Sequence, residues 1–230
     1  LINTHVDIYF LNLLAFDVLQ SIGGIINAKW VADAAISPGP LCDSQGILKN
    51  AGALGGAMFI LAITIHTAAA LLWKWKVPKS FAIPLVITLA IWLFIALGIG
   101  VSWSLYRHRQ YIDITGMWCW IGSDFKNQRL LFEYAWMWIT VFFNLLVYIP
   151  LYFSLRGNLS VSGFHVKWTS LYPLAYTITV IPFSICRWRT FNGYSVPWAA
   201  TVVADILFCS SGLVNSLLYP LTRPSLLPAG

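Results

Sequence analysis

Six long apolar stretches, separated by short polar connections, constrain the fold of this chain more than any other feature. They cover residues 8–26, 47–73, 81–103, 130–155, 168–188 and 196–221. A helix needs about 20 apolar residues, each rising 1.5 Å, to cross a hydrocarbon core of about 30 Å. The stretches have that length and lack the in/out alternation of a transmembrane strand. We therefore predict six transmembrane helices.

The composition supports a bilayer as the main solvent. The 230 residues are 59% hydrophobic and only 10% charged, whereas soluble domains carry about 25% charged residues. The 14 Lys and Arg fall almost entirely between the apolar stretches or at their edges. The net charge of +6 therefore does not indicate a nucleic-acid partner. We expect an all-α, polytopic membrane helix bundle that forms a single domain over residues 1–230.

The distribution of basic residues bears on orientation. The total number of Lys and Arg does not distinguish the two membrane faces of the predicted bundle. However, Lys74, Lys76 and Lys79 lie close together in the connection after the second stretch. Positively charged loops favour the cytosolic face. We expect this face, which also carries the C-terminus, to be cytosolic, and the membrane to be the plasma membrane.

Two of the four cysteines, Cys42 and Cys119, fall in connections on the opposite face. Disulfides persist only in oxidising compartments, so a bond between these two would make that face extracellular or lumenal. It would stabilise the fold by roughly 4–5 kcal/mol in the chain-entropy model. The alternative is two free thiols on cytosolic loops.

Several polar side chains interrupt the apolar stretches. Asp17 lies within "LLAFD", His66 within "ITIHT", and Asn215 and Tyr219 within "GLVNSLLYPL". A carboxylate at mid-bilayer normally faces a polar interior. One hypothesis is a polar network of these four residues that switches between two arrangements. The alternative is that each is satisfied by a local hydrogen bond between helices.

The second stretch contains "NAGALGGAMF" at residues 50–59. Small residues let membrane helices approach closely, so we expect this helix at the crowded centre of the bundle. Soluble catalytic and metal-binding motifs such as HExxH or CxxC are absent from the sequence. We therefore expect no enzyme activity, no cofactor and no metal.

These pieces together resemble G-protein-coupled receptors. "LLAFD" resembles their second helix, and a cysteine before the next helix matched by one in a long outer loop resembles their shared disulfide. "WCWIG", "YPLAYTITVIPFSICRW" and "GLVNSLLYPLTR" are similar to the fungal and slime-mould cyclic-AMP-receptor-like and glucose-sensing receptors. The resemblance implies that the six stretches match helices two to seven of a seven-helix receptor, with the first helix missing. The Asp-Arg-Tyr motif of rhodopsin-like receptors is absent, which argues against that class.

The resemblance also implies a ligand pocket at the outer ends of the helices. Its predicted residues are Lys49, Trp120, Glu133, Trp136, Arg187, Trp188 and Asp205. Arg187 would suit an anion, although Arg187 and Lys49 could equally contact lipid phosphates. The tryptophans beside Cys119 would cover the pocket or, alternatively, anchor at the headgroups.

On the cytosolic face, the resemblance implies contacts with a heterotrimeric G protein or with anionic lipid. The predicted contact residues are Lys74, Lys76, Lys79, Arg156 and Arg223. A six-helix transporter or channel is the alternative to a receptor, and it would need a polar stripe along several helices. A membrane enzyme would need clustered His, Asp or Glu. The ligand is not identified by the sequence, and a homo-oligomer remains an option.

Overall fold

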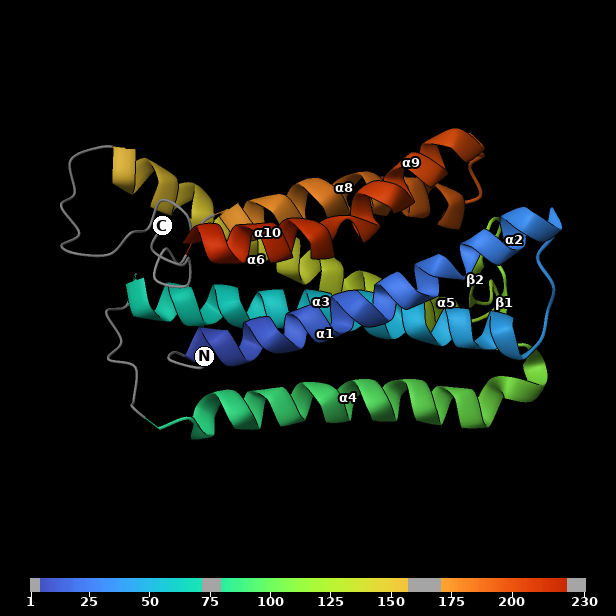
Figure 1. Cartoon of the computed structure of the whole chain (residues 1–230), viewed down its shortest axis with the longest axis horizontal. Helices are drawn as coiled ribbons and strands as arrows, with labels where there is room; N and C mark the ends of the chain where they lie inside the picture. Colours follow the sequence, from blue (N-terminus) through green and yellow to red (C-terminus); the bar gives the residue numbers. More distant parts are fainter. Residues whose placement is uncertain (1–4, 72–79, 157–170, 223–230) are drawn as a thin grey trace, which may run out of the picture. The chain divides into compact units, whose positions relative to one another are not determined.

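The computed structural model describes residues 5–71, 80–156 and 171–222 (Figure 1). The chain divides into two compact units, residues 1–140 and 141–230, and each is described by itself. Of the predicted G-protein or lipid contacts, Lys74, Lys76, Lys79 and Arg223 lie outside the described residues. Arg156 ends a helix, and its side chain lies outside the description as well.

The first unit consists of helices and one small antiparallel hairpin. Its elements are α1 (His5–Ile25), α2 (Asn27–Asp33), α3 (Pro40–Leu71), α4 (Ala82–Tyr106), the 3₁₀ turn η1 (Arg107–Arg109), β1 (Ile112–Ile114), β2 (Cys119–Ile121), α5 (Lys126–Arg129), the π-helical η2 (Leu130–Tyr134) and the beginning of α6 (Ala135–Arg156). We call the end of this unit that carries β1, β2 and the start of α3 the hairpin end.

Five helical segments are long and apolar enough to cross a membrane, among the residues that the structure describes. They are His5–Asp33, Pro40–Ala70, Ala82–Arg109, Lys126–Pro150 and Trp198–Leu217. By these helices the chain is an integral membrane protein with an all-α bundle. The predicted stretch 168–188 is helical as α8 (Leu171–Phe191), but it is not among the five.

Close packing of α1 against α3 forms the centre of the first unit. The span in α3 is the most buried of the five, with 67% of its apolar window inside the structure. A Cβ added at Gly52 would come within 2.5 Å of the Gln20 Cβ, and one at Gly55 would meet the ring of Phe16. The Gly-rich segment therefore allows the two helices to touch, as its small residues predict.

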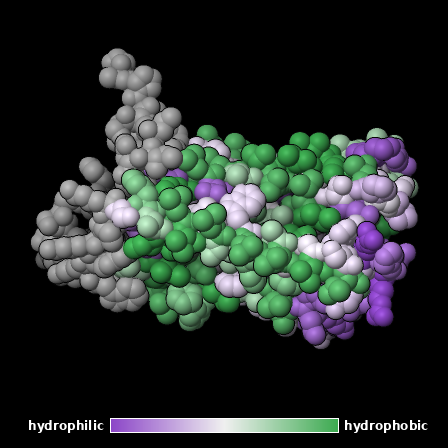
Figure 2. Space-filling view, turned by 90° about the horizontal axis from the view of Figure 1, so that it is seen from below, coloured by the Kyte–Doolittle hydropathy of each residue, from purple (hydrophilic) through white to green (hydrophobic). Residues whose placement is uncertain are grey.

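Helix α4 lies on the outside of the first unit. Only 17% of its apolar window is buried, and Leu89, Leu93 and Leu97 are 67%, 60% and 55% exposed. The Trp92 indole donates a hydrogen bond of 2.8 Å to Asn12 Oδ1 of α1. Figure 2 shows an apolar surface over this face, with hydrophilic residues gathered at one end. Such a row of large apolar side chains is suited to lipid.

The second unit contains the rest of α6, then α8, α9 (Trp198–Cys209) and α10 (Ser211–Thr222). Helices α8 and α9 pack through the stacked rings of Phe183 and Phe208, whose centroids are 4.6 Å apart. Pro182 lies inside α8 and Pro150 inside α6, which membrane helices tolerate when neighbours satisfy the freed carbonyls.

Two of the predicted helices need correction. The second helix begins at Pro40 instead of residue 47, because proline is well suited to the first helical position. Cys42 therefore lies in a helix and not in a loop. The last stretch is divided at Ser210 into α9 and α10. The predicted start of the fourth stretch at residue 130 coincides with the first residue of η2, whose π-helical geometry apolar periodicity does not reveal.

The close approach at Gly55 generates a stability prediction. Gly55→Ala should lower the thermal unfolding midpoint in detergent, because overpacking against Phe16 costs about 1–3 kcal/mol. The matched control is Gly100→Ala in α4, where an added Cβ meets nothing within 4 Å. Alanine favours a helix by up to about 1 kcal/mol over glycine, so the control should keep or raise the midpoint. Equal midpoints for the two variants would contradict the packing described.

Candidate functional site

The hairpin positions the aromatic side chains of the candidate site. Strands β1 and β2 pair antiparallel, with Ile112 opposite Ile121 and Ile114 opposite Cys119. The connecting turn is closed by a hydrogen bond of 2.9 Å from Thr115 N to Trp118 O. Trp118, Cys119 and Trp120 are 3%, 0% and 3% exposed. The tryptophans on both sides of Cys119 are therefore packed against the protein.

A disulfide between Cys42 and Cys119 fixes this hairpin to the first turn of α3. The sequence-based pairing is thus confirmed. The two Cα atoms are 5.2 Å apart, within the usual range for a disulfide. The bond joins residues 77 positions apart in the chain, so it restricts a large part of the unfolded ensemble.

Gln45, one turn after Cys42, makes the second attachment of the hairpin. Its side chain is 0% exposed. Its Oε1 accepts hydrogen bonds from Cys119 N at 2.9 Å and from Trp30 Nε1 at 2.8 Å. Its Nε2 donates to Asn27 Oδ1 at 2.6 Å and to Gly23 O at 3.1 Å. A single amide therefore ties β2 to α1, α2 and α3.

Glu133 lies under β2, in the π-helical segment η2. It is 3% exposed, and its Oε2 accepts hydrogen bonds from Trp120 Nε1 at 2.6 Å and from Asn50 Nδ2 at 3.2 Å. Asn50 also donates to Phe132 O at 3.2 Å. Hydrogen bonds to an ionised group are stronger than neutral ones, and π-helical turns are frequent at functional sites.

Two cations lie over the tryptophans of the hairpin. Lys49 Nζ is 4.2 Å from the centroid of the Trp118 ring, and Arg129 Cζ is 4.8 Å from that of Trp120. Arg129 Nε also donates to Ile121 O at 2.8 Å. Cation–π contacts contribute about 0.5–2 kcal/mol each, more when desolvated. We call the six residues Lys49, Asn50, Trp118, Trp120, Arg129 and Glu133 the hairpin cluster.

A polar pocket of about 180 Å³ lies beside the disulfide. Its lining includes Asp43, Arg107, Tyr111 and Asp113. Burial raises the pKa of the Tyr111 phenol above its ordinary value. A hydrogen bond with Ser102 opposes this rise, and the nearby Glu133 carboxylate adds to it. The phenol therefore stays protonated at neutral pH and can donate a hydrogen bond in this pocket.

Three predicted ligand residues, Lys49, Trp120 and Glu133, belong to the hairpin cluster. Trp136 lies one helical turn further on and contacts Phe94 edge to face, with centroids 5.4 Å apart. The others, Arg187, Trp188 and Asp205, belong to the second unit. There the guanidinium of Arg187 lies 5.4 Å from the Phe183 ring, and Asp205 is buried. A shared ligand role for all seven stays a prediction.

The predicted switch network also divides between the two units. Asp17 and His66 are buried in the first unit, and Asn215 is buried in α10, which also contains Tyr219. His66 lies far along α3 from the hairpin, and its ring contacts those of His5 and Tyr9. A coupled network stays a prediction.

Gln45, Asn50 and Arg129 also belong to this region and were not predicted from the sequence. A signal was present for Gln45, because Cys42, Gln45 and Lys49 follow helical spacing and share one face of a helix. The spacing becomes informative only with a helix that begins at Pro40, because a start at residue 47 leaves Cys42 and Gln45 in a loop. No group of three or more His, Cys, Asp or Glu that could hold a metal ion occurs among the described residues.

Comparison with known proteins does not identify a family for this chain. No protein-family model matches the chain, and no curated protein matches it.

The Trp120–Glu133 hydrogen bond is testable by a substitution that keeps an aromatic ring. Trp120→Phe removes the N–H that donates to Glu133, so a buried carboxylate loses a donor at a cost of about 1–3 kcal/mol. The thermal midpoint in detergent should fall. Trp198→Phe is the control, because Trp198 is 70% exposed and its change should stay within about 0.5 kcal/mol. A Trp120→Phe protein as stable as the control would argue against the hydrogen bond.

Proposed function

We propose that this protein is a G-protein-coupled receptor that senses a small molecule at the hairpin end and signals to a cytosolic heterotrimeric G protein. One observation carries the proposal. A hairpin attached by a disulfide covers buried groups of opposite charge, Lys49 and Glu133, at one end of a membrane helix bundle. Buried charges in membrane proteins are costly and are usually functional.

The hairpin cluster offers a polar ligand both charge and aromatic faces. Lys49 and Arg129 are suited to an anionic group, and the indoles of Trp118 and Trp120 to a flat or apolar one. A ligand that binds Lys49 competes with Trp118 for it, and a ligand that binds Glu133 competes with Trp120. Ligand binding is therefore linked to the position of the hairpin.

Two connections would carry this change into the bundle. The disulfide joins β2 to α3, and the Trp120–Glu133 hydrogen bond joins β2 to η2 and hence to α6. Since η2 is π-helical, a return to α-helical geometry would alter the register of α6. A ligand shifts such an equilibrium only by its differential affinity for the two arrangements.

The proposal includes a membrane topology. Six spans, with α8 as the fifth in chain order, correspond to helices two to seven of a seven-helix receptor. The hairpin end faces the outside of the plasma membrane, and the C-terminus is cytosolic. Lys74, Lys76, Lys79, Arg156 and Arg223 contact the G protein or anionic lipid.

A nucleotide-exchange assay tests the receptor proposal. The chain is expressed with a panel of G-protein α subunits, and loading of a labelled GTP analogue is measured against a library of small polar metabolites. Cyclic AMP and glucose are the first probes, because of the resemblance of the motifs. We expect at least one compound to raise the rate of exchange in a saturable manner.

The matched variants are Lys49→Gln and Lys126→Gln. Lys49 is buried against Trp118, whereas Lys126 is exposed. Loss of one charged contact costs about 1.5–3 kcal/mol, so Lys49→Gln should raise the half-maximal ligand concentration about tenfold or more. Lys126→Gln should leave it unchanged. Absence of exchange across the panel, together with solute flux in proteoliposomes, would favour the transporter or channel.

A further inference from the structure

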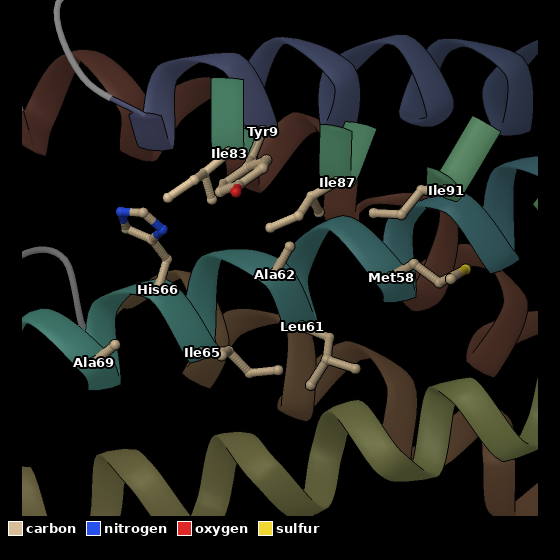
Figure 3. Close-up of a pocket in the computed structure, with 10 residues that line it drawn as sticks. All are labelled: Tyr9, Met58, Leu61, Ala62, Ile65, His66, Ala69, Ile83, Ile87 and Ile91. Atoms are coloured by element: carbon tan, nitrogen blue, oxygen red, sulfur yellow. The ribbon is translucent and has the colours of Figure 1, made fainter. Parts of the chain in front are cut away.

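A second candidate site lies at the other end of the first unit, between α1, α3 and α4. It is a pocket of about 360 Å³, within the range of small-molecule sites. Figure 3 shows its two sides: Ile83, Ile87 and Ile91 from α4, and Met58, Leu61 and Ile65 from α3. No Lys, Arg, Asp or Glu occurs among the described residues that line it. An ionic ligand would lose its hydration here without compensation.

The polar groups of this pocket are concentrated at one end. Tyr9 is 0% exposed, and its hydroxyl has no hydrogen-bond partner among the described residues. In Figure 3 this hydroxyl and the imidazole of His66 both point into the pocket. Because an orphaned buried hydroxyl is costly, the arrangement is suited to a ligand that brings one hydrogen-bonding group.

The polarity follows the direction expected of a membrane lipid. His66 lies near the end of α3 and Ile83 near the start of α4, whereas Met58 and Ile91 lie further toward the middle of these helices. The eight helical steps from Met58 to His66 correspond to about 12 Å along the helix. The polar end thus lies toward the membrane surface, and the apolar part extends toward the bilayer centre.

We propose that this pocket binds a sterol-class lipid, a compact apolar body with a single hydroxyl. The hydroxyl bonds to Tyr9, and the ring system lies along the isoleucines of α4. The pocket has no lysine or arginine for a phosphate among its described residues, which argues against a phospholipid headgroup. The pocket is open to the bilayer at Ile65, a lining residue that is 45% exposed. The proposal depends on the membrane location and not on the receptor function.

Photolabelling of the full chain in phosphatidylcholine vesicles tests the proposal. The probe is a photoreactive cholesterol analogue, and unlabelled cholesterol is the competitor. We expect saturable, competable labelling on residues of α1, α3 and α4 that line the pocket. Labelling confined to exposed α4 positions such as Leu85 and Leu89, without saturation, would overturn the proposal and indicate annular lipid only.

Tyr9→Phe tests the recognition of the hydroxyl with little change of volume. Loss of one hydrogen bond should weaken competition by cholesterol about five- to tenfold. Cholestane lacks the hydroxyl and cannot form this hydrogen bond. It should therefore compete with the probe equally weakly in the wild-type protein and in Tyr9→Phe. If cholesterol competes with the probe equally well in both proteins, a sterol hydroxyl at Tyr9 is contradicted. Competition by oleate that is as strong as competition by cholesterol would contradict it as well.

Ile87→Trp fills the pocket and serves as a second variant. It should abolish saturable labelling, whereas the control Leu89→Trp, at a position 67% exposed on the same helix, should retain it. Retained labelling in a folded Ile87→Trp protein would place the lipid elsewhere and refute the proposal.

Discussion

The attachment of the hairpin to α3 is the constraint on which the candidate site depends. The Cys42–Cys119 disulfide supplies a covalent link, and Gln45 adds a hydrogen bond to the backbone of Cys119. Without both, three-residue strands would have little stability of their own. With both, Trp118 and Trp120 are held over Lys49 and Glu133, and the buried charges receive aromatic and hydrogen-bonding partners.

Helix α3 connects the two candidate sites of the first unit. Its first half carries Cys42, Gln45 and Lys49, and its second half lines the apolar pocket up to His66. Between them, the Gly-rich segment lets α1 pack directly against it. Since tightly packed helices move as units with few intermediate positions, a shift of α3 at the hairpin would also change the pocket.

The sequence predicted the features that follow from composition and periodicity. Apolar length predicted the helices, and the placement of the cysteines predicted the disulfide. The resemblance implied Lys49, Trp120 and Glu133 as ligand residues; all three lie at the hairpin, and their ligand role stays a prediction. The hairpin and the π-helical turn could not be predicted, because their short segments have no periodicity to read and depend on tertiary contacts. Gln45 was missed because polar residues near Pro40 resemble a loop, although they begin a helix.

The central claim is that the hairpin is covalently fixed to the start of α3 on an oxidising face of the membrane. Mass spectrometry of the protein, purified with free thiols blocked and digested without reductant, measures this directly. We expect a linked peptide pair that contains Cys42 and Cys119. Recovery of both cysteines as blocked thiols, or of a linkage from either one to Cys186 or Cys209, would contradict it.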